Sequence, residues 1–329
     1  MNTTMNNLQK KELSILIPTY NDDCHDLVEQ LARQAAAINE LEYEILVADD
    51  ASSLTRVIMS NRRINDLPHC RFIENAVNRG RAAIRNALMR EAKYAWLLFI
   101  DADMQITHAD YLLKYLNTTE QMQVVSGGYE IVGSHEQLGH NLRFLYEKAN
   151  EKHANSEKRN KCPMKDFHTS NFLISQELMN EHPLDERFLH YGYEDVLYGK
   201  ALSDIGIQIT HIDNPVGFCK FEDNHEFIKK TEEGLRTLSL FSQELEGYSR
   251  LLDFRKQHPV LTRWCNRLYK RQRKSWRQKL CSDSPSLLIF KLYKLGYLSR
   301  QMEKQGLNES NTSSKDGMEN YRATEPQRQ

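Results

Sequence analysis

The sequence predicts an α/β domain with a mostly parallel sheet flanked by helices, followed by a helical C-terminal appendage. Short apolar runs without alternation recur through the first hundred residues, and stretches with helical patterns separate them. Polar residues follow these runs where the strands would end. Apolar runs separated by helices are typical of a parallel sheet that is covered on both faces. A chain of 329 residues is long enough for such a domain and an appendage.

Four apolar runs predict the first strands, at residues 13–18, 43–48, 70–74 and 96–100. The segments between them predict helices at 22–38, around 54–58 and over the Ala-rich stretch 80–93. We expect Asp22 or Asp23 to cap the first of these helices, because Asp side chains accept hydrogen bonds from exposed N–H groups at helix starts.

Charge is distributed unevenly along the chain. The whole chain has 44 basic and 45 acidic residues, and this balance indicates no class of binding partner. Residues 262–301, however, contain eleven Lys or Arg and one acid, Asp283. Apolar residues recur within this basic segment, so it could lie on an anionic membrane surface or pack against the rest of the protein. The acidic remainder of the chain argues against nucleic acid as a partner.

The sequence predicts four parts: an N-terminal extension at 1–10, the α/β sheet domain at 11–225, C-terminal helices at 226–301 and a disordered tail at 302–329. The tail is rich in Asn, Ser, Glu and Gln. No apolar run approaches the ~18 residues of a membrane span, and the first residues are polar, so we expect a cytoplasmic protein. The six cysteines lack regular spacing, which favours reduced thiols.

Polar residues cluster where three of the predicted strands end, and parallel sheets bind ligands at this edge. Asp is also common in turns and helix caps, so one such residue would be uninformative. The pair Asp101 and Asp103 follows a buried strand and offers hard oxygen ligands, which suit Mg²⁺ or Mn²⁺ bound to a diphosphate. Arg81 and Arg85 share a helical face and could meet phosphates or a carboxylate.

Five segments together resemble a known family. They are SILIPTYND, EILVADDAS, NRGRAAIRNAL and WLLFIDADM within residues 13–104, and GYED at 192–195. They are similar to the motifs of family 2 glycosyltransferases, which have the GT-A fold, and the resemblance extends over about residues 13–225. It implies an inverting transfer of sugar from a nucleotide-sugar, with a UDP-sugar as the expected donor. It also implies a glycan or lipid-linked acceptor and cell-surface polysaccharide synthesis. If the acceptor is lipid-linked, the basic segment 262–301 would bring the protein to it at the inner face of the membrane.

The resemblance implies roles for individual residues. Asp195, or its neighbour Glu194, would be the general base. Asp103 would bind the Mn²⁺ or Mg²⁺ ion, with Asp101 near the ion or the ribose. The donor would contact Pro18, Thr19, Tyr20, Asp49 or Asp50, Asn78 and Arg85, with Asp49 favoured over Asp50 for the base.

One position departs from the family's pattern. Many relatives carry a metal-binding His after the segment that resembles Ile212–Val216, and Phe218 stands there in this chain. His211 and His225 lie nearby but do not match, and for His168 we expect a structural role. Two alternatives stay open: a nucleotide-binding module that has lost turnover, and a sugar nucleotidyltransferase. The acidic, Gly-free loop after the first strand argues against the second.

Overall fold

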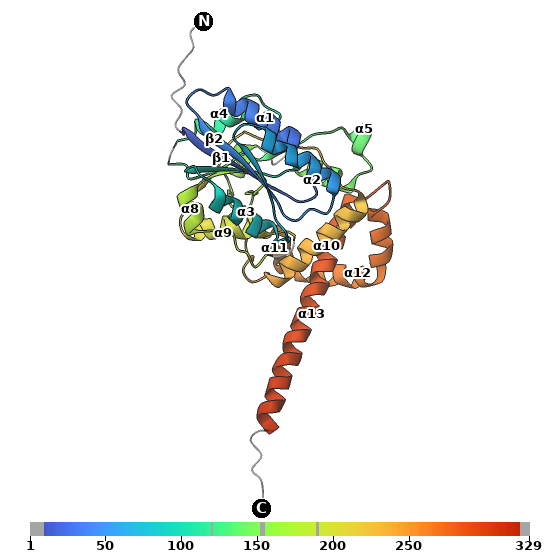
Figure 1. Ribbon diagram of the computed structural model, residues 1–329. Helices are drawn as coiled ribbons and strands as arrows, with labels where there is room; N and C mark the ends of the chain where they lie inside the picture. Colours follow the sequence, from blue (N-terminus) through green and yellow to red (C-terminus); the bar gives the residue numbers. More distant parts are fainter. Residues whose placement is uncertain (1–9, 120, 152–154, 189–190, 323–329) are drawn as a thin grey trace, which may run out of the picture.

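The computed structural model describes residues 10–119, 121–151, 155–188 and 191–322, with the backbone alone from residue 306 onward. The predicted extension, apart from Lys10, and residues 323–329 of the predicted tail therefore lie outside the described residues. At the centre is a seven-stranded sheet of order β3-β2-β1-β4-β8-β6-β9, with helices on both faces (Figure 1). The predicted α/β class is confirmed.

All neighbouring strands of this sheet are parallel except at β8, which runs antiparallel to both β4 and β6. The strands are β1 (Glu12–Thr19), β2 (Glu42–Asp49), β3 (Cys70–Glu74), β4 (Trp96–Ile100), β6 (Val124–Ser126), β8 (Asn171–Ser175) and β9 (Ile209–His211). A small second sheet joins β5 (Met104–Gln105), β10 (Val216–Phe218) and β7 (Tyr129–Ile131) in the order β5-β10-β7.

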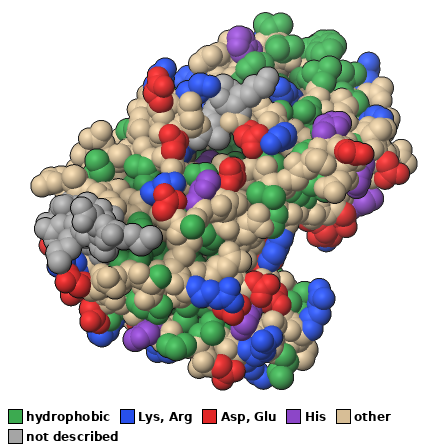
Figure 2. Space-filling model, turned by 90° about the horizontal axis from the view of Figure 1, so that it is seen from above, with side chains coloured by type: hydrophobic (Ala, Val, Ile, Leu, Met, Phe, Trp, Pro, Cys, Tyr) green, Lys and Arg blue, Asp and Glu red, His purple; other side chains and the backbone are tan. Residues whose placement is uncertain are grey.

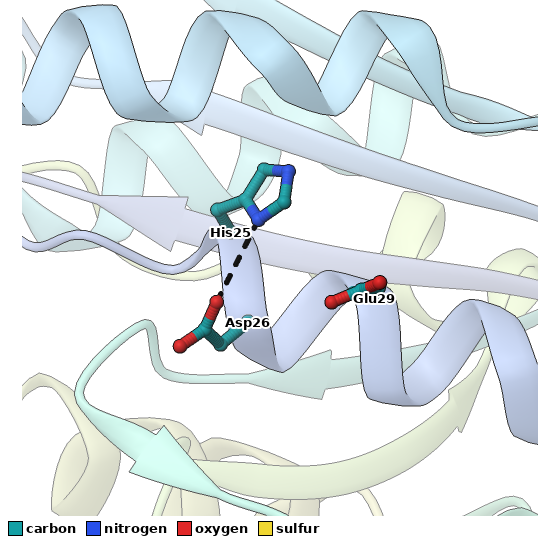
Figure 3. Close-up of side chains that lie close together, drawn as sticks. All are labelled: His25, Asp26 and Glu29. Carbon is teal, nitrogen blue, oxygen red and sulfur yellow. Dashed lines mark ion pairs between the residues drawn. The ribbon is translucent and has the colours of Figure 1, made fainter.

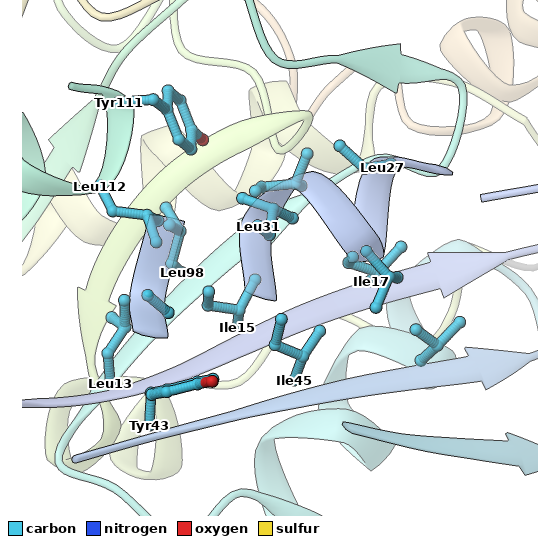
Figure 4. Packing of buried hydrophobic residues seen from close by; sticks show 14 of the residues in the cluster. Leu13, Ile15, Ile17, Leu27, Leu31, Tyr43, Ile45, Leu98, Tyr111 and Leu112 are labelled. Atoms are coloured by element: carbon cyan, nitrogen blue, oxygen red, sulfur yellow. The ribbon is translucent and has the colours of Figure 1, made fainter. Parts of the chain in front are cut away.

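Alternation along β1 divides the core into two layers. Leu13, Ile15 and Ile17 face α1 (His25–Ala36) and α4 (Tyr111–Leu116), as Figure 4 shows from close by. Leu16 points to the opposite layer, which contains α3 (Arg81–Glu91), α8 (Gln176–Glu181) and α9 (Glu194–Asp204). Successive side chains of a strand point to opposite faces, so an uninterrupted apolar run serves both layers.

The predicted strands at 70–74 and 96–100 agree with β3 and β4. The predicted cap of the first helix is wrong, because α1 begins at His25 and Cys24 holds the N-cap position. Asp23 instead accepts a hydrogen bond from the His25 N–H at 3.2 Å, one residue before the cap position. The shorter helices connecting the core are α2 (Thr55–Arg62), η1 (Arg63–Asp66), α5 (His135–Leu138), α6 (Leu142–Asn150) and α7 (Ser156–Arg159).

Four helices follow the sheet domain: α10 (Asn224–Leu240), α11 (Arg250–Gln257), α12 (Pro259–Leu280) and α13 (Leu287–Arg322). Helices α10, α12 and α13 form with α6 an apolar cluster that includes Leu142, Phe227, Tyr269, Trp276 and Phe290. Most of the apolar stripe in the basic segment is therefore buried against the body, although Trp264 is 55% exposed. All six cysteines are free thiols, as expected.

Helix α13 continues through residues 302–322, where the composition predicted disorder. Its first part is held by packing and by side-chain hydrogen bonds, including one from Ser239 Oγ to Gln305 Oε1 at 2.6 Å. Extending a formed helix costs far less than nucleating one, so a packed helix can continue into a polar segment. Figure 1 shows the end of α13 projecting away from the body.

Candidate active site

A cavity of about 390 Å³ opens where the carboxyl end of β4 meets the first turn of α9. The strand order reverses between β1 and β4, the kind of position at which open α/β sheets bind ligands. Four of the predicted site residues line this cavity: Asp101, Asp103, Glu194 and Asp195. The structure thus brings together the two acidic motifs that are ninety residues apart in the sequence.

Asp101 is held by two arginines of α3. Arg85 donates from Nη2 to Asp101 Oδ1, and Arg81 Nη2 lies 3.2 Å from Oδ2. Arg85 is buried behind Asp101 and does not line the cavity, whereas the Arg81 side chain is 39% exposed and does. The prediction that both arginines could meet a carboxylate agrees with this geometry. Arg81 is the arginine that faces a ligand.

Asp103 lies beside Asp101 with fewer compensating charges. Burial, together with the negative charges of Asp101 and Asp22, raises the pKa of Asp103 to about 6. A carboxylate that resists ionisation, with a second carboxylate beside it, is a donor set that a divalent cation would stabilise. The residues present therefore fit a hard metal ion, with Asp103 as the more available ligand, since both oxygens of Asp101 already contact guanidinium groups.

Glu194 and Asp195 form the first turn of α9, and a sharp reversal aims them at the cavity. Gly192 and Tyr193 both have left-handed backbones, with φ of 97° and 70°. Glycine adopts such angles freely, but for a tyrosine they are strained. Tyr193 is the N-cap residue, so this reversal directs the helix N-terminus toward the centre of the site.

The two carboxylates of this turn differ in exposure. Glu194 is buried, 6% exposed, and its Oε1 lies 2.9 Å from Arg81 Nε. Burial raises the pKa of Glu194 despite the nearby Arg81. Asp195 is 21% exposed and accepts a hydrogen bond at 2.9 Å from His168, whose Nδ1 is then protonated. Of the two candidate bases, Asp195 is therefore the one that a substrate hydroxyl can reach.

His168 and Asp195 stabilise each other's charged forms. Burial alone would raise the pKa of Asp195, but the hydrogen bond and charge of His168 and the N–H of Val196 bring it below its ordinary value. Burial alone would lower the pKa of His168, but Asp195 raises it. His168 therefore contacts the candidate base directly, which the expected structural role did not include.

Phe218 and Arg143 occupy the place where the sequence departed from the family's pattern. Strand β10 pairs Phe218 with Met104, so the ring lies next to the turn that carries Asp103. The Arg143 guanidinium lies over this ring, with its carbon 4.4 Å from the centroid, and lines the same cavity. It also pairs with Glu222, and its charge lowers the pKa of Asp103. The Arg143 guanidinium therefore lies near the position where the family's pattern has a third metal ligand.

The two histidines near this position are placed elsewhere. His211 is buried between the Pro163 carbonyl, 2.9 Å from Nε2, and Arg159, 2.7 Å from Nδ1. Burial lowers its pKa to about 4. His225 is an exposed residue in the first turn of α10 and does not line the cavity. Neither histidine replaces the missing ligand.

The remaining predicted donor contacts do not line the cavity and instead build turns at the sheet edge. Asp49 accepts hydrogen bonds from both the N–H and the hydroxyl of Ser52. Asp50 accepts from the N–H groups of Arg79 and Gly80 at 2.8 and 2.9 Å, and its carbonyl accepts from Asn78. Pro18 and Thr19 are buried at the end of β1, and Tyr20 is 50% exposed.

Several residues of the cavity wall carried no recognisable signal in the sequence. They come from β7, α6, the turn before α9, α10 and α13, and they are Tyr129, Arg143, Tyr146, Tyr191, Lys230 and Lys294. Lys or Arg near aromatic residues is common in sequences, both in cores and on surfaces. Only the three-dimensional structure therefore shows that these side chains line the cavity. Lys and Arg are interspersed with Asp and Glu on the face shown in Figure 2, without one large patch of a single sign.

Among the described residues, one further group could offer three metal ligands: His25, Asp26 and Glu29 at the start of α1 (Figure 3). His25 Nδ1 lies 3.7 Å from Asp26 Oδ1. Asp26 is almost fully exposed, and Glu29 is paired with Arg33 one turn along. This group is a solvated helix terminus. It lines neither the cavity described above nor a larger one that lies between the sheet domain and the C-terminal helices.

Comparison with known proteins gives the family. The family model described as "Glycosyl transferase family 2" matches residues 14–182, half of the chain. The chain belongs to glycosyl transferase family 2. The matched segment contains Asp101, Asp103 and His168, whereas Glu194, Asp195 and Phe218 lie beyond it. The resemblance seen in the motifs is thereby confirmed.

Two curated relatives agree with this family. The chain is 25% identical over 279 residues to a chondroitin synthase of Pasteurella multocida (strain Pm70), covering 75% of this chain and 29% of that protein. It is 33% identical over 93 residues to an uncharacterized glycosyltransferase of Haemophilus influenzae, covering 28% of this chain and 29% of that one. The chain thus spans less than a third of the length of each relative.

The chain is also similar to solved structures, including these two. One is the mannosyltransferase PcManGT from Pyrobaculum calidifontis in complex with GDP-Man and Mn²⁺, with 16% identity, a TM-score of 0.47 and coverage of 93% and 76% of the two chains. The other is S. aureus TarS 1-349 in complex with UDP, with 16% identity, a TM-score of 0.48 and coverage of 90% and 92%.

Proposed function

We propose that this chain is an inverting glycosyltransferase with Asp195 as its general base. The observation that carries the proposal is the position of this partly exposed carboxylate. It lines the same cavity as Asp101 and Asp103, which fit a metal-bound diphosphate. A single base is sufficient for an in-line displacement, whereas retention by two displacements would need a nucleophile as well. A UDP-sugar is the proposed donor.

The reaction follows from the groups on the cavity wall. The acceptor oxygen attacks the anomeric carbon while the bond from that carbon to the diphosphate oxygen breaks. The hydroxyl proton passes to Asp195, and the bonding electron pair leaves with the nucleoside diphosphate. Such proton removal contributes roughly 10²–10⁴-fold to a rate. His168 orients Asp195 through its Nδ1–H bond and keeps the carboxylate ionised.

The leaving diphosphate needs positive charge on the opposite side of the cavity. Arg81 and Arg143 both line it, and Arg81 is placed between Asp101 and Glu194. Mn²⁺ or Mg²⁺ held by Asp103 and Asp101 would neutralise further charge on the leaving group. Arg143, whose guanidinium lies over the ring of Phe218, would add positive charge for the diphosphate but no metal ligand.

A glycan or lipid-linked acceptor and a role in cell-surface polysaccharide synthesis are part of the same proposal, as is attachment to an anionic membrane surface through residues 262–301. None of the described helices is long and apolar enough to cross a bilayer.

The basic side chains of α12 support surface attachment, because Arg263, Arg267 and Lys270 are exposed while the apolar stripe is largely buried. Deleting the segment would break the apolar cluster, so charge removal is the cleaner test. Replacing these three bases with Gln should reduce co-sedimentation with anionic vesicles.

The experiment that tests the transferase proposal is a comparison of Asp195→Asn with wild type. We expect sugar transfer or donor hydrolysis to fall by roughly 10²–10⁴-fold while the UDP-sugar still raises the melting temperature. Asp204→Asn, at the far end of the same helix and paired with Lys200, is the matched control. Binding without turnover in wild type would favour the degenerate module. Formation of UDP-sugar from UTP and a sugar phosphate would favour the nucleotidyltransferase.

A further inference from the structure

A second, larger cavity of about 630 Å³ lies between the sheet domain and the C-terminal helices. One wall comes from β7, α6 and α9, and the other comes from α11, α12 and α13. Its wall shares seven residues with the first cavity: Tyr129, Tyr146, Glu147, His168, Tyr193, Val196 and Lys294. His168 is one of the shared residues and bonds Asp195, so a molecule in the second cavity contacts the partner of the candidate base, and one that extends into the first cavity reaches the base itself.

The helical wall of this cavity is mostly apolar. It is formed by Leu251 and Phe254 of α11, Leu261 of α12, and Leu292 and Leu295 of α13. Phe254 and Leu261 remain 37% and 45% exposed. Each Å² of apolar surface removed from water contributes roughly 25 cal/mol, which a ligand with a hydrocarbon part would gain here. A polar sugar chain alone would leave this wall unused.

Two lysines of α13 supply positive charge at the same wall. Among the described residues, no carboxylate lies within ion-pair distance of Lys291 or Lys294, and Lys294 rests over the ring of Tyr146 at 4.1 Å. The arginines and the remaining lysine of the cavity have partners. Lys165 lies 3.2 Å from Asp253, and Arg250 lies 2.7 Å from Asp166. Arg159 lies 3.9 Å from Asp213 and donates to the carbonyl oxygens of Gly127 and Ile212. The two lysines therefore remain available to an anionic group.

We propose that this cavity binds the non-reacting part of the acceptor and that the acceptor is an anionic amphiphile. Its hydrocarbon part would lie on the apolar wall, its anionic group at Lys291 and Lys294, and its sugar hydroxyl at Asp195. The proposal rests on the proposed function for the role of Asp195. It goes further by naming the chemical class of the acceptor and the helices that select it.

Three probes separate the parts of this ligand: octyl glucoside 6-phosphate, octyl glucoside and glucose 6-phosphate, each kept below its micelle concentration. Binding to the full chain is measured by calorimetry without donor, so turnover is not needed. We expect the first probe to bind at least tenfold more tightly than either of the others. Equal binding of glucose 6-phosphate would indicate an acidic glycan and overturn the amphiphile. Equal binding of octyl glucoside would overturn the anionic group.

Two pairs of variants locate the binding. Lys291→Gln should remove the advantage of the phosphate probe over octyl glucoside, whereas Lys274→Gln, on the exposed face of α12, should keep it. Leu261→Gln should remove the advantage over glucose 6-phosphate, whereas Leu288→Gln, 68% exposed and outside the cavity, should keep it. Equal effects within either pair would overturn the proposed location.

A separate titration with UDP-sugar distinguishes the two proposals. If UDP-sugar binds and the phosphate probe does not, the acceptor proposal fails while the transferase proposal stands. If the phosphate probe binds as expected and no nucleotide-sugar does, the cavity remains an amphiphile site and the transferase proposal fails.

Discussion

Two acidic turns flank β1 at the same edge of the sheet, one after β2 and one after β4. In the first, Asp50 accepts hydrogen bonds from the backbone N–H groups of Arg79 and Gly80. In the second, Asp101 is held by guanidinium groups, and Asp103 faces an open cavity. Carboxylates bound to fixed backbone dipoles shape a loop, whereas those paired with side chains beside a cavity can exchange partners with a ligand. The group that binds the carboxylate, a backbone N–H or a side-chain guanidinium, therefore distinguishes a structural acid from a functional one.

The largest expected effect is the loss of stability when the buried ion pair between Arg85 and Asp101 in the second turn is broken. Arg85→Met should lower the free energy of unfolding by about 3–5 kcal/mol, because it removes one partner of a buried ion pair and leaves Asp101 underpaired. Urea denaturation measures this. Arg81→Met, one helical turn earlier and 39% exposed, should cost less stability but reduce transfer more. Equal losses of stability would contradict the distinction between the two arginines.

The first turn should respond through stability alone. Asp50→Asn should lower the free energy of unfolding by about 1–3 kcal/mol, because one of the two backbone N–H groups would face an amide NH₂ in place of an acceptor. UDP-sugar affinity of the folded protein should stay unchanged in a calorimetric titration. A tenfold weaker affinity would break the comparison, since Asp50 would then contact the donor as the motif implied.

Asp103→Asn should have the opposite effects: stability should be kept, and metal-dependent ligand binding should weaken. Burial and Asp101 raise the pKa of Asp103 to about 6, so its ionised form opposes folding at neutral pH. The neutral amide should leave the melting temperature unchanged or higher, while the Mn²⁺-dependent part of UDP binding weakens at least tenfold. Thermal shifts with and without Mn²⁺ measure both effects. A Mn²⁺ response equal to that of wild type would exclude Asp103 as a ligand.

The smallest effect concerns the partner of the candidate base. His168 lowers the pKa of Asp195, so His168→Gln should move the acid limb of the pH–activity profile to higher pH. The pair stabilises the fold between the lowered pKa of Asp195 and the raised pKa of His168, and it is lost below the first and above the second. His225→Gln, on the exposed start of α10, is the control. An unmoved acid limb would remove His168 from the positioning of Asp195.

The sheet and its acidic edges were predictable because apolar runs, Ala-rich helices and turn residues are local signals. Residues 96–100 form β4 as expected, and Asp101 and Asp103 follow it. The partners of these acids were not predictable from local patterns. Arg143 reaches the site from α6 because β10 brings Phe218 beside Met104, and this contact joins segments far apart in the chain. The choice between Arg81 and Arg85 also depends on how deeply α3 packs.

The left-handed backbone of Tyr193 has a consequence for the molecule's heat tolerance. A glycine at this position would adopt the φ of 70° without strain, and releasing such strain is worth on the order of 1 kcal/mol. The tyrosine side chain, however, lines both cavities. The ring also packs against the apolar cluster that contains Leu235 and Leu238, and losing this packing costs more than the released strain. Variants screened for survival at high temperature should therefore retain tyrosine at 193, as should variants screened for product.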